Sequence, residues 1–339
     1  MKKKEKLFNK KEGNVPIWLM RQAGRYQKEY REIRKTEKSF LDLCYNSEKV
    51  HDITMLPIKS FGFDAAIIFS DILVLPHILG WDVNFKEGEG PILRRFESAK
   101  DFQYFTDEFD HKVENIYTAI NKLSNNLPED VSLIGFAGSP WTVTSYLLEG
   151  RGKQNFSVSK SFIYNNYKTV LKLINFITDK TIRHLENQIK AGVNVIQLFD
   201  SWSGMLSGNE YNDFVIKPTQ KIVKQIKENH PTIPVIGFPR GSGFLYDEYI
   251  TKTGIDAVSV DQFVPVAKMK EWQKDLVVQG NLDPVVLLSN KETIAMKAEE
   301  ILSNIDRKNF IFNLGHGILP STPVENVKFL VDYVKNYQK

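Results

Sequence analysis

The chain has 339 residues, of which 42% are hydrophobic and 25% charged, and its formal net charge is +4 at pH 7. These proportions are typical of a soluble globular protein. The sequence has no dense basic tract with interleaved aromatic residues, so we expect no nucleic-acid partner. It also has no run of about 18 apolar residues, so we expect no membrane span. Residues 1–14 are basic and lack the apolar segment of a signal peptide. We expect them to form a flexible tail before a single domain over residues 15–339.

Cys44 is the one cysteine of the sequence. An intrachain disulfide and a multi-cysteine metal site are therefore excluded. This cysteine usage suits a reducing compartment, and we expect a cytoplasmic protein. The sequence also lacks a dinucleotide fingerprint or a cluster of metal-ligand residues, so we expect neither a cofactor nor a metal.

Eight short apolar runs, rich in valine, isoleucine and phenylalanine, alternate with amphipathic stretches along the chain. Continuous apolar runs of this length are typical of strands that are buried on both faces. The runs span residues 16–20, 65–69, 132–136, 193–199, 234–238, 257–260, 276–280 and 310–314.

Helices are expected between these runs. Apolar residues recur at helical spacing over 165–190, and Gly192 should end that helix. Thr322, Pro323 and Glu325 resemble a capping box at the start of a helix over 322–336. Asp283, followed by proline, should open another helix in a similar way.

Eight strands alternating with helices predict an α/β fold, a single-domain (β/α)8 TIM-type barrel. An open doubly wound sheet is the alternative, because that fold needs no particular number of strands. The stretch 77–130 is longer than one crossover helix requires, and the GEGP turn at 88–91 indicates an inserted hairpin or loop.

Two arginines follow the first apolar run, at Arg21 and Arg25. Arginine keeps its charge and presents a planar fork of donors that matches a carboxylate. The small residues between them, Ala23 and Gly24, leave room for a ligand against the backbone. The alternative is an ordinary helix start with two solvated arginines.

Polar residues also follow the other runs. In a barrel of this type, the carboxyl ends of the strands form the active-site face, so these side chains should meet at one mouth. They are Ser70, Asp71, Ser139, Trp141, Tyr146, Asp200, Ser201, Arg240, Asp261, Asn281, Asp283 and His316.

Structural roles compete with this interpretation. Asp71, Ser201 and Asp261 could cap helices or satisfy backbone donors, and a cap suits Asp283 better than a functional role. Pro76 would soon interrupt a helix that begins after Asp71, which weakens the cap explanation there. Tyr146 could belong to the core, and a lone histidine such as His316 could be structural.

Six segments between residues 16 and 320 resemble the uroporphyrinogen decarboxylase family, in the family's order. They are PIWLMRQAGRY, DAAIIFSDILVLP, LIGFAGSPWTVTSYLLEG, QLFDSWSG, QGNLDP and NLGHGILP. The resemblance implies a cofactor-free barrel, usually a homodimer, that acts in haem biosynthesis. Such an enzyme removes carboxyl groups from the four acetate side chains of uroporphyrinogen III, giving coproporphyrinogen III and CO2.

The resemblance also implies a set of site residues. Those that match the family's substrate-binding positions are Arg21, Gln22, Ala23, Gly24, Arg25, Asp71, Tyr146, Ser201 and His316. Catalytic roles are expected for Asp71, Arg21, Tyr146 and His316. Asp71 should stabilise a protonated pyrrole, whereas the proton donor stays open between Arg21, His316 and water.

Two further arginines are left out of this predicted site. Arg34 matches a family arginine, but it lies half a turn out of phase with Arg25 on a regular helix. Arg240 stands where many relatives carry lysine, and either residue supplies positive charge.

Two other functions are weighed against decarboxylation. Related barrels are methyltransferases with a zinc site of histidine and cysteine at strand ends, but Cys44 lies in the first connecting stretch, far from any strand end. A catalytically inactive tetrapyrrole carrier would keep the arginines but could lose Asp71. CO2 release distinguishes the carrier from the enzyme.

Overall fold

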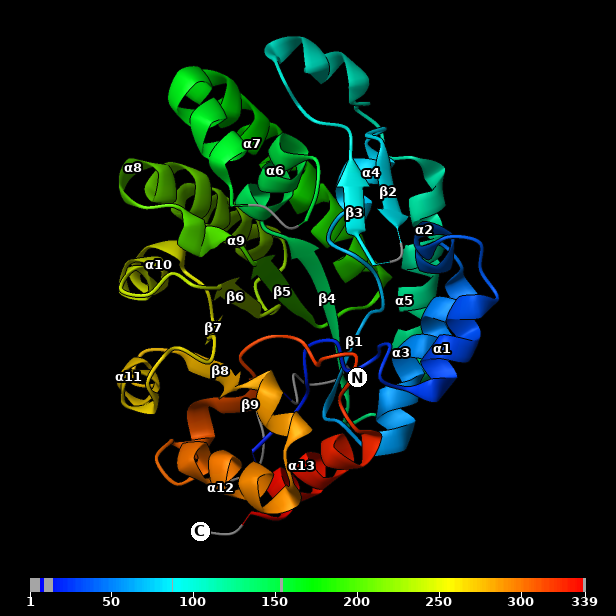
Figure 1. The fold of residues 1–339 in the computed structure, drawn as a ribbon, viewed down its shortest axis with the longest axis vertical. Coiled ribbons are helices and arrows are strands. Elements are labelled where there is room, and N and C mark those ends of the chain that lie inside the picture. The colour runs from blue at the N-terminus through cyan, green and yellow to red at the C-terminus, as the bar shows by residue number, and fades with distance from the viewer. Residues whose placement is uncertain (1–6, 9–14, 87, 153–154, 338–339) are drawn as a thin grey trace.

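The computed structural model describes residues 7–8, 15–86, 88–152 and 155–337. Seven parallel strands form one sheet in the order β1-β4-β5-β6-β7-β8-β9, with the helices outside it (Figure 1). The strands are β1 Ala65–Ile67, β4 Ser132–Gly138, β5 Val195–Asp200, β6 Val235–Pro239, β7 Ala257–Ser259, β8 Val277–Leu282 and β9 Phe310–Leu314. The helices are α1 Lys28–Lys35, α2 Phe40–Cys44, α3 Ser47–Phe61, α4 Val74–Ile78, α5 Glu114–Asn126, α6 Pro140–Glu149, α7 Ser157–Ala191, α8 Gly208–Tyr211, α9 Lys217–Asn229, α10 Leu245–Thr253, α11 Val266–Trp272, α12 Lys291–Leu302 and α13 Val324–Asn336.

The eighth position of the barrel is filled by the segment before β1. Trp18 N–H donates to the Phe312 carbonyl over 3.4 Å, and Phe312 N–H donates to the Pro16 carbonyl over 2.8 Å. On the other side, Asp64 N–H donates to the Ile17 carbonyl over 3.0 Å, and Ile17 N–H donates to Asp64 Oδ2 over 2.8 Å. The segment thus contacts both edges of the sheet, and the (β/α)8 architecture is confirmed. The strand predicted over 16–20 is reduced to a single bridge at Ile17.

The barrel interior combines apolar side chains with one polar layer. Trp18 is fully buried there, and its indole N–H donates to Gln279 Oε1 over 2.8 Å. The amide of Gln279 donates in turn to Gln197 and Ser259. Leu7 belongs to the same apolar cluster, and its N–H donates to Ser132 Oγ over 3.1 Å. The rest of the predicted tail, residues 1–6 and 9–14, lies outside the described residues.

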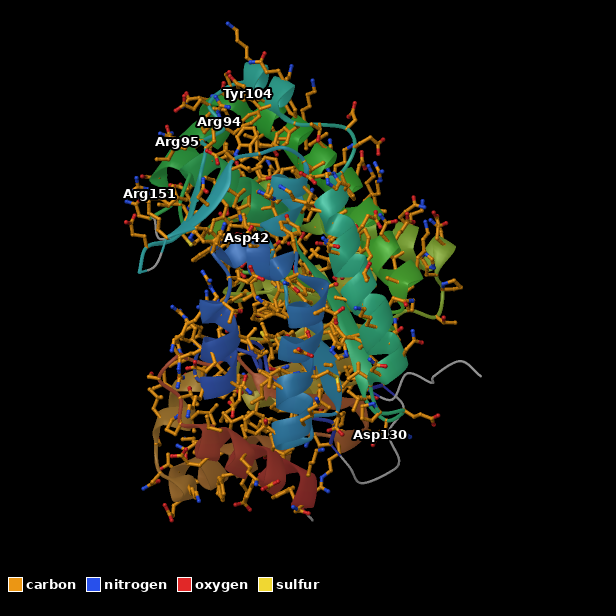
Figure 2. All side chains as sticks on the ribbon, turned by 90° about the vertical axis from the view of Figure 1, so that its right-hand side faces the viewer. Asp42, Arg94, Arg95, Tyr104, Asp130 and Arg151 are labelled. Atoms are coloured by element: carbon orange, nitrogen blue, oxygen red, sulfur yellow. The ribbon has the colours of Figure 1, made fainter. Side chains whose placement is uncertain are left out.

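The predicted insertion is confirmed as an antiparallel hairpin of β2 Val83–Lys86 and β3 Gly90–Leu93. The hairpin lies outside the barrel sheet and joins the end of α6, where Leu93 N–H donates to the Gly150 carbonyl over 2.8 Å. Figure 2 shows Arg94 and Tyr104 together near the upper end of the molecule. The guanidinium of Arg94 lies 3.6 Å from the centroid of the Tyr104 ring, which ties the chain after the hairpin to the next turn.

The predicted helix ends are partly right. Gly192, with φ of +123°, ends α7 as expected, and Asp283 caps a 3-10 helix over Pro284–Leu288 by accepting from Val285 N–H. The capping box before α13 is wrong. Pro323 is the N-cap residue, and the Thr322 hydroxyl is buried without a hydrogen-bond partner among the described residues. None of the described helices combines the length and apolar character that a membrane span requires.

We expect Asp64→Ala to destabilise the barrel, because it removes the acceptor of the Ile17 N–H at the closing segment. An unsatisfied buried backbone donor typically costs about 1–3 kcal/mol, and Asp64→Asn should lose less because an acceptor is retained. Urea unfolding measures the change. Asp130→Ala is the matched control, since Asp130 is an exposed acidic residue in the turn before β4 (Figure 2) and should change stability by less than about 0.5 kcal/mol. Equal losses at the two positions would contradict the proposed role of Asp64.

Candidate active site

The turn that carries Arg21 is held in place by its neighbour. Arg21 has a φ of +62°, a left-handed conformation that is uncommon for a residue with a side chain. Gln22 is fully buried, and its amide donates to the Ala65 carbonyl over 3.0 Å while its Oε1 accepts from Leu19 N–H over 3.2 Å. Gln22 therefore anchors the turn to β1, and its side chain does not reach the mouth.

Glycines next to Arg21 fit closely around it. A methyl group at Gly317 would overlap Cγ and Cδ of the Arg21 side chain, so only glycine leaves room for that side chain. Gly24 lies against the Arg21 carbonyl, where an added Cβ would be 3.2 Å from the oxygen. Ala23, also half-buried, packs against the core. These small residues make room for the arginine itself, besides any room for a ligand.

Asp71 and Arg21 face each other at the mouth. Asp71 follows β1, and its Oδ1 accepts from Leu73 N–H over 2.8 Å in the turn before α4. Asp71 is therefore not the helix cap that was considered, because the N-cap residue of α4 is Leu73 and it has no side-chain cap hydrogen bond. Burial raises the pKa of Asp71, while the Leu73 N–H and the charge of Arg21 act in the opposite direction. Arg21 retains exposed surface toward the opening but is surrounded by protein on its other sides. Burial lowers the pKa of Arg21, and Asp71 is the strongest influence that raises it.

Tyr146 and His316 lie beside this pair. Burial raises the pKa of the half-buried Tyr146, and the charge of Asp71 adds to the effect. Burial, with smaller contributions from Arg21 and Arg240, lowers the pKa of His316 to about 3. His316 is therefore a neutral imidazole at neutral pH. Its Nδ1 is buried and has no hydrogen-bond partner among the described residues.

Ser201 and Arg25 complete the predicted set. Ser201 follows β5, and no hydrogen bond joins its hydroxyl to the described residues, whereas Ser203 Oγ donates to the carbonyls of Asp200 and Arg240. Neither serine caps the 3-10 helix Ser203–Met205, whose N-cap residue is Trp202 and has no side-chain cap hydrogen bond. Arg25 is exposed and lies close enough to Arg21 for its charge to lower the pKa of that guanidinium. The structure brings the charged and hydroxyl groups of the set to one end of the barrel.

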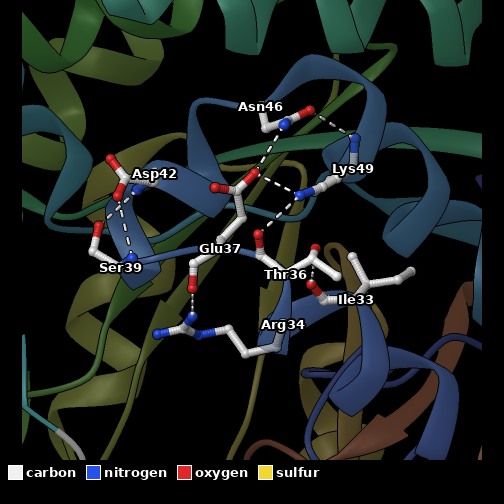
Figure 3. Close-up of polar contacts among 8 residues, drawn as sticks. All are labelled: Ile33, Arg34, Thr36, Glu37, Ser39, Asp42, Asn46 and Lys49. Carbon is white, nitrogen blue, oxygen red and sulfur yellow. Dashed lines mark hydrogen bonds and ion pairs between the residues drawn. The ribbon is translucent and has the colours of Figure 1, made fainter.

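Arg240 also belongs to this end of the barrel, although it was left out of the predicted site. Its charge acts on both Arg21 and His316, and its Nε is buried without a hydrogen-bond partner among the described residues. The position of Arg240 directly after β6 was the sequence signal that it lies at this end of the barrel. Arg34, by contrast, donates to the Glu37 carbonyl over 2.9 Å at the end of α1 (Figure 3).

The structure also decides between the alternatives for Asp261 and corrects the expectations for Asp200 and Cys44. Asp261 accepts from Gly241 N–H over 2.6 Å and from the Tyr246 hydroxyl over 3.0 Å, so its structural role is confirmed. Asp200 is fully buried and contacts α6 instead of facing the mouth. Cys44 was expected far from any strand end. In the fold Cys44 is buried and lies close to Asp71. Burial is the main cause that raises the pKa of its thiol, and the charge of Asp71 adds to the effect.

The fold resembles solved structures over nearly the whole chain. A methyltransferase from Methanosarcina mazei has a TM-score of 0.79 at 19% identity, covering 97% of this chain and 96% of that protein. A B12-independent methionine synthase from Shewanella sp. W3-18-1 has a TM-score of 0.58 at 12% identity, covering 97% of each chain. At these identities the likeness concerns the fold alone. Within the described residues, no group of three or more histidine, cysteine, aspartate or glutamate side chains is placed to hold a metal ion.

The sequence has much closer relatives. The family described as "Uroporphyrinogen decarboxylase (URO-D)" matches residues 5–337. A uroporphyrinogen decarboxylase of Rickettsia africae (strain ESF-5) is 56% identical over 338 residues, covering 99% of this chain and 98% of the relative. One of Rickettsia felis (strain ATCC VR-1525 / URRWXCal2) is 58% identical over 325 residues, covering 96% and 94%. The chain therefore belongs to the uroporphyrinogen decarboxylase family.

Proposed function

We propose that the chain removes the carboxyl groups of the four acetate side chains of uroporphyrinogen III, giving coproporphyrinogen III and CO2 in haem biosynthesis. The observation that carries this proposal is the apposition of Asp71 to Arg21, with Arg25 and Arg240 close to the same guanidinium. The substrate has carboxylates at its periphery and pyrrole N–H groups at its centre. Arginines match the first of these groups, and a single carboxylate matches the second.

The chemistry explains why one buried carboxylate is needed. A pyrrole acetate loses CO2 only if the electrons of the broken bond have a sink. Protonation of the pyrrole ring carbon creates that sink as an iminium-like cation, and loss of CO2 leaves an exocyclic methylene. A second proton then completes the new methyl group while the ring carbon releases the first, so each CO2 lost consumes one proton. Asp71 stabilises the cation and accepts from the pyrrole N–H groups. Arg21 and the Leu73 N–H favour the ionised form of Asp71, which is the form that this role requires.

The remaining side chains bind carboxylates or relay protons. Because His316 is neutral at neutral pH, it serves as a hydrogen-bond partner of a substrate carboxylate rather than as a cationic acid. The proton reaches the ring through Arg21, whose pKa is lowered by burial, or through a water that Arg21 orients. Tyr146 and Ser201 supply hydroxyl groups for a carboxylate or for that water.

We also propose a cytoplasmic homodimer. The loops after β6 and β7 carry Phe244, which is fully exposed, and Phe263, which is 75% exposed. Two large apolar side chains on neighbouring loops of the mouth suit a contact with a second copy of the chain.

Sedimentation equilibrium tests the dimer. The double substitution Phe244→Ser and Phe263→Ser should shift the protein to the monomer.

One assay tests the function. The protein is incubated anaerobically with uroporphyrinogen III, the products are oxidised, and the porphyrins are separated by their number of carboxyl groups. Decarboxylation yields species with progressively fewer carboxyl groups and an equivalent amount of CO2. Tight binding of the porphyrinogen without CO2 release would instead favour the carrier function.

We expect Asp71→Asn to lower kcat by about 10²-fold or more, because it removes the charge that stabilises the protonated pyrrole. The fold should be unaffected, since asparagine retains an acceptor for the Leu73 N–H. Steady-state kinetics and thermal unfolding measure the two effects.

Asp283→Asn is the matched control for this substitution. Asp283 also follows a strand and also accepts from the backbone N–H two residues later, at Val285, over 2.9 Å. This control should retain normal kcat and stability. A folded Asp71→Asn protein with near-normal turnover would refute the electrostatic role of Asp71, while the family assignment would stand.

We expect Arg25→Ala mainly to weaken substrate binding, because it removes a bidentate contact with a carboxylate. KM should rise more than kcat falls. Lys28→Ala removes a neighbouring exposed cation at the start of α1 and should leave both constants unchanged. A fall in kcat at unchanged KM would instead assign Arg25 to the transition state.

We expect activity to survive exhaustive dialysis against a chelator, because the family resemblance implies cofactor-free chemistry. Turnover before and after dialysis is compared in the same anaerobic assay, with a mock-dialysed sample as the control. A loss that one added metal or organic cofactor restores would contradict the expectation.

A further inference from the structure

The turn after β5 is tied to α6 by two side-chain hydrogen bonds. Trp202 N–H donates to Thr142 Oγ1 over 3.2 Å, and the Trp141 indole N–H donates to the Trp202 carbonyl over 2.9 Å. Both backbone polar groups of Trp202 are thus held by side chains of one helix. Ser201 shares a peptide group with Trp202, so its backbone is fixed by the same contacts.

Asp200 anchors Thr142 from below the turn. The Thr142 hydroxyl donates to Asp200 Oδ1 over 2.6 Å, and both residues are fully buried. Asp200 Oδ2 has no hydrogen-bond partner in the described part of the chain. Burial raises the pKa values of Tyr211 and Tyr249, and Asp200 adds to both shifts, which places its carboxyl toward the outer helices.

Asp200 therefore has no direct contact with the mouth. The pKa shifts of Arg21, Asp71 and His316 arise from burial and from other groups. Burial of a carboxyl with one side-chain donor is costly, and it raises the pKa of Asp200 to about 7. Such a cost is typical of groups that are retained for function. The path from Asp200 to the site runs through Thr142.

The same face of α6 carries Tyr146. Thr142 and Tyr146 are four residues apart, so they are neighbours on the helix surface. The centroids of the Tyr146 and Trp202 rings are 6.4 Å apart, in an edge-to-face arrangement. The Phe156 ring also packs against the Trp202 ring, with 4.8 Å between their centroids. Trp202 is thus packed between the helix that carries Tyr146 and the loop that follows it.

We propose that Thr142, anchored by Asp200, is a positioning residue that fixes Ser201 and Tyr146 relative to each other at the mouth. The proposal rests on the proposed function, in which both hydroxyl groups contact the substrate or a proton-relay water. Thr142 itself does not touch the substrate. Misplacement of a contact by about 1 Å can cost up to roughly 10²-fold in rate, so loosening this link should impair the reaction in protein that is still folded.

Thr142→Val tests the link, because it keeps the shape of the side chain and removes its hydroxyl. We expect kcat/KM to fall by about 10-fold or more, with a larger change in KM than in kcat. Thr142→Ser should restore most of the activity, since it retains the hydroxyl.

Thr144→Val is the matched control. Thr144 lies on the same helix and is equally buried, but its hydroxyl has no hydrogen-bond partner among the described residues. It should stay within about 2-fold of the wild type if buried hydroxyls matter only through their hydrogen bonds. Equal losses for the two valine variants, or wild-type kcat and KM in folded Thr142→Val, would overturn the proposal.

Two further measurements keep the test decisive. If Thr142→Val does not fold, Trp141→Phe removes the second tie to Trp202 and keeps an aromatic ring. Its kcat/KM must then fall several-fold, and an unchanged value would overturn the proposal. Equilibrium binding of coproporphyrinogen III to each variant reports the geometry without turnover. Failure of the proposed function would appear separately, as a wild-type protein that releases no CO2.

Discussion

The position of the active site depends on how the barrel closes. The segment 16–18 bonds to β9 on one side and, through Asp64, to the chain before β1 on the other. Arg21 and Arg25 follow this segment, so the same contacts that join the two edges of the sheet also place Arg21 near Asp71 and Arg25 near Arg21. The carboxylate of Asp64 accepts the Ile17 N–H, which a carbonyl of a neighbouring strand would otherwise accept. This contact lets the chain leave the sheet after a single bridge and turn across the mouth.

Much of this arrangement could be predicted from sequence, for one geometric reason. Parallel strands share one edge for their carboxyl ends, so the residues after each apolar run must gather there. Asp71, Ser201 and Arg240 come from three separate strands and could be located in this way. The first strand was harder to predict, because an apolar run indicates that a segment is buried but not that it pairs with other strands. The run is buried as expected, yet only Ile17 forms a bridge.

The direction of individual side chains could not be predicted. Successive residues of a strand point to opposite faces, so Asp200 turns to α6 while Ser201 lies at the mouth. Gln22 lies between Arg21 and Ala23 of the predicted site, but its amide donates a hydrogen bond to the carbonyl of Ala65 in β1. Cys44, the last residue of α2, is near Asp71 through a tertiary contact that has no local signal in the sequence. The positive φ of Arg21 likewise depends on neighbours distant in sequence.

The imbalance of charge at the mouth has a consequence for turnover. Arg21 has Arg25 and Arg240 close by, and Asp71 is the acidic side chain that acts most strongly on it, so we expect the mouth to attract polyanions. Each molecule of CO2 that leaves takes one carboxylate from the bound ligand, and the attraction weakens by one charge at every step. We therefore expect the affinity to fall as the reaction proceeds, so that the starting tetrapyrrole binds more tightly than the product. On this expectation, the loss of charge during the reaction itself favours release of the product.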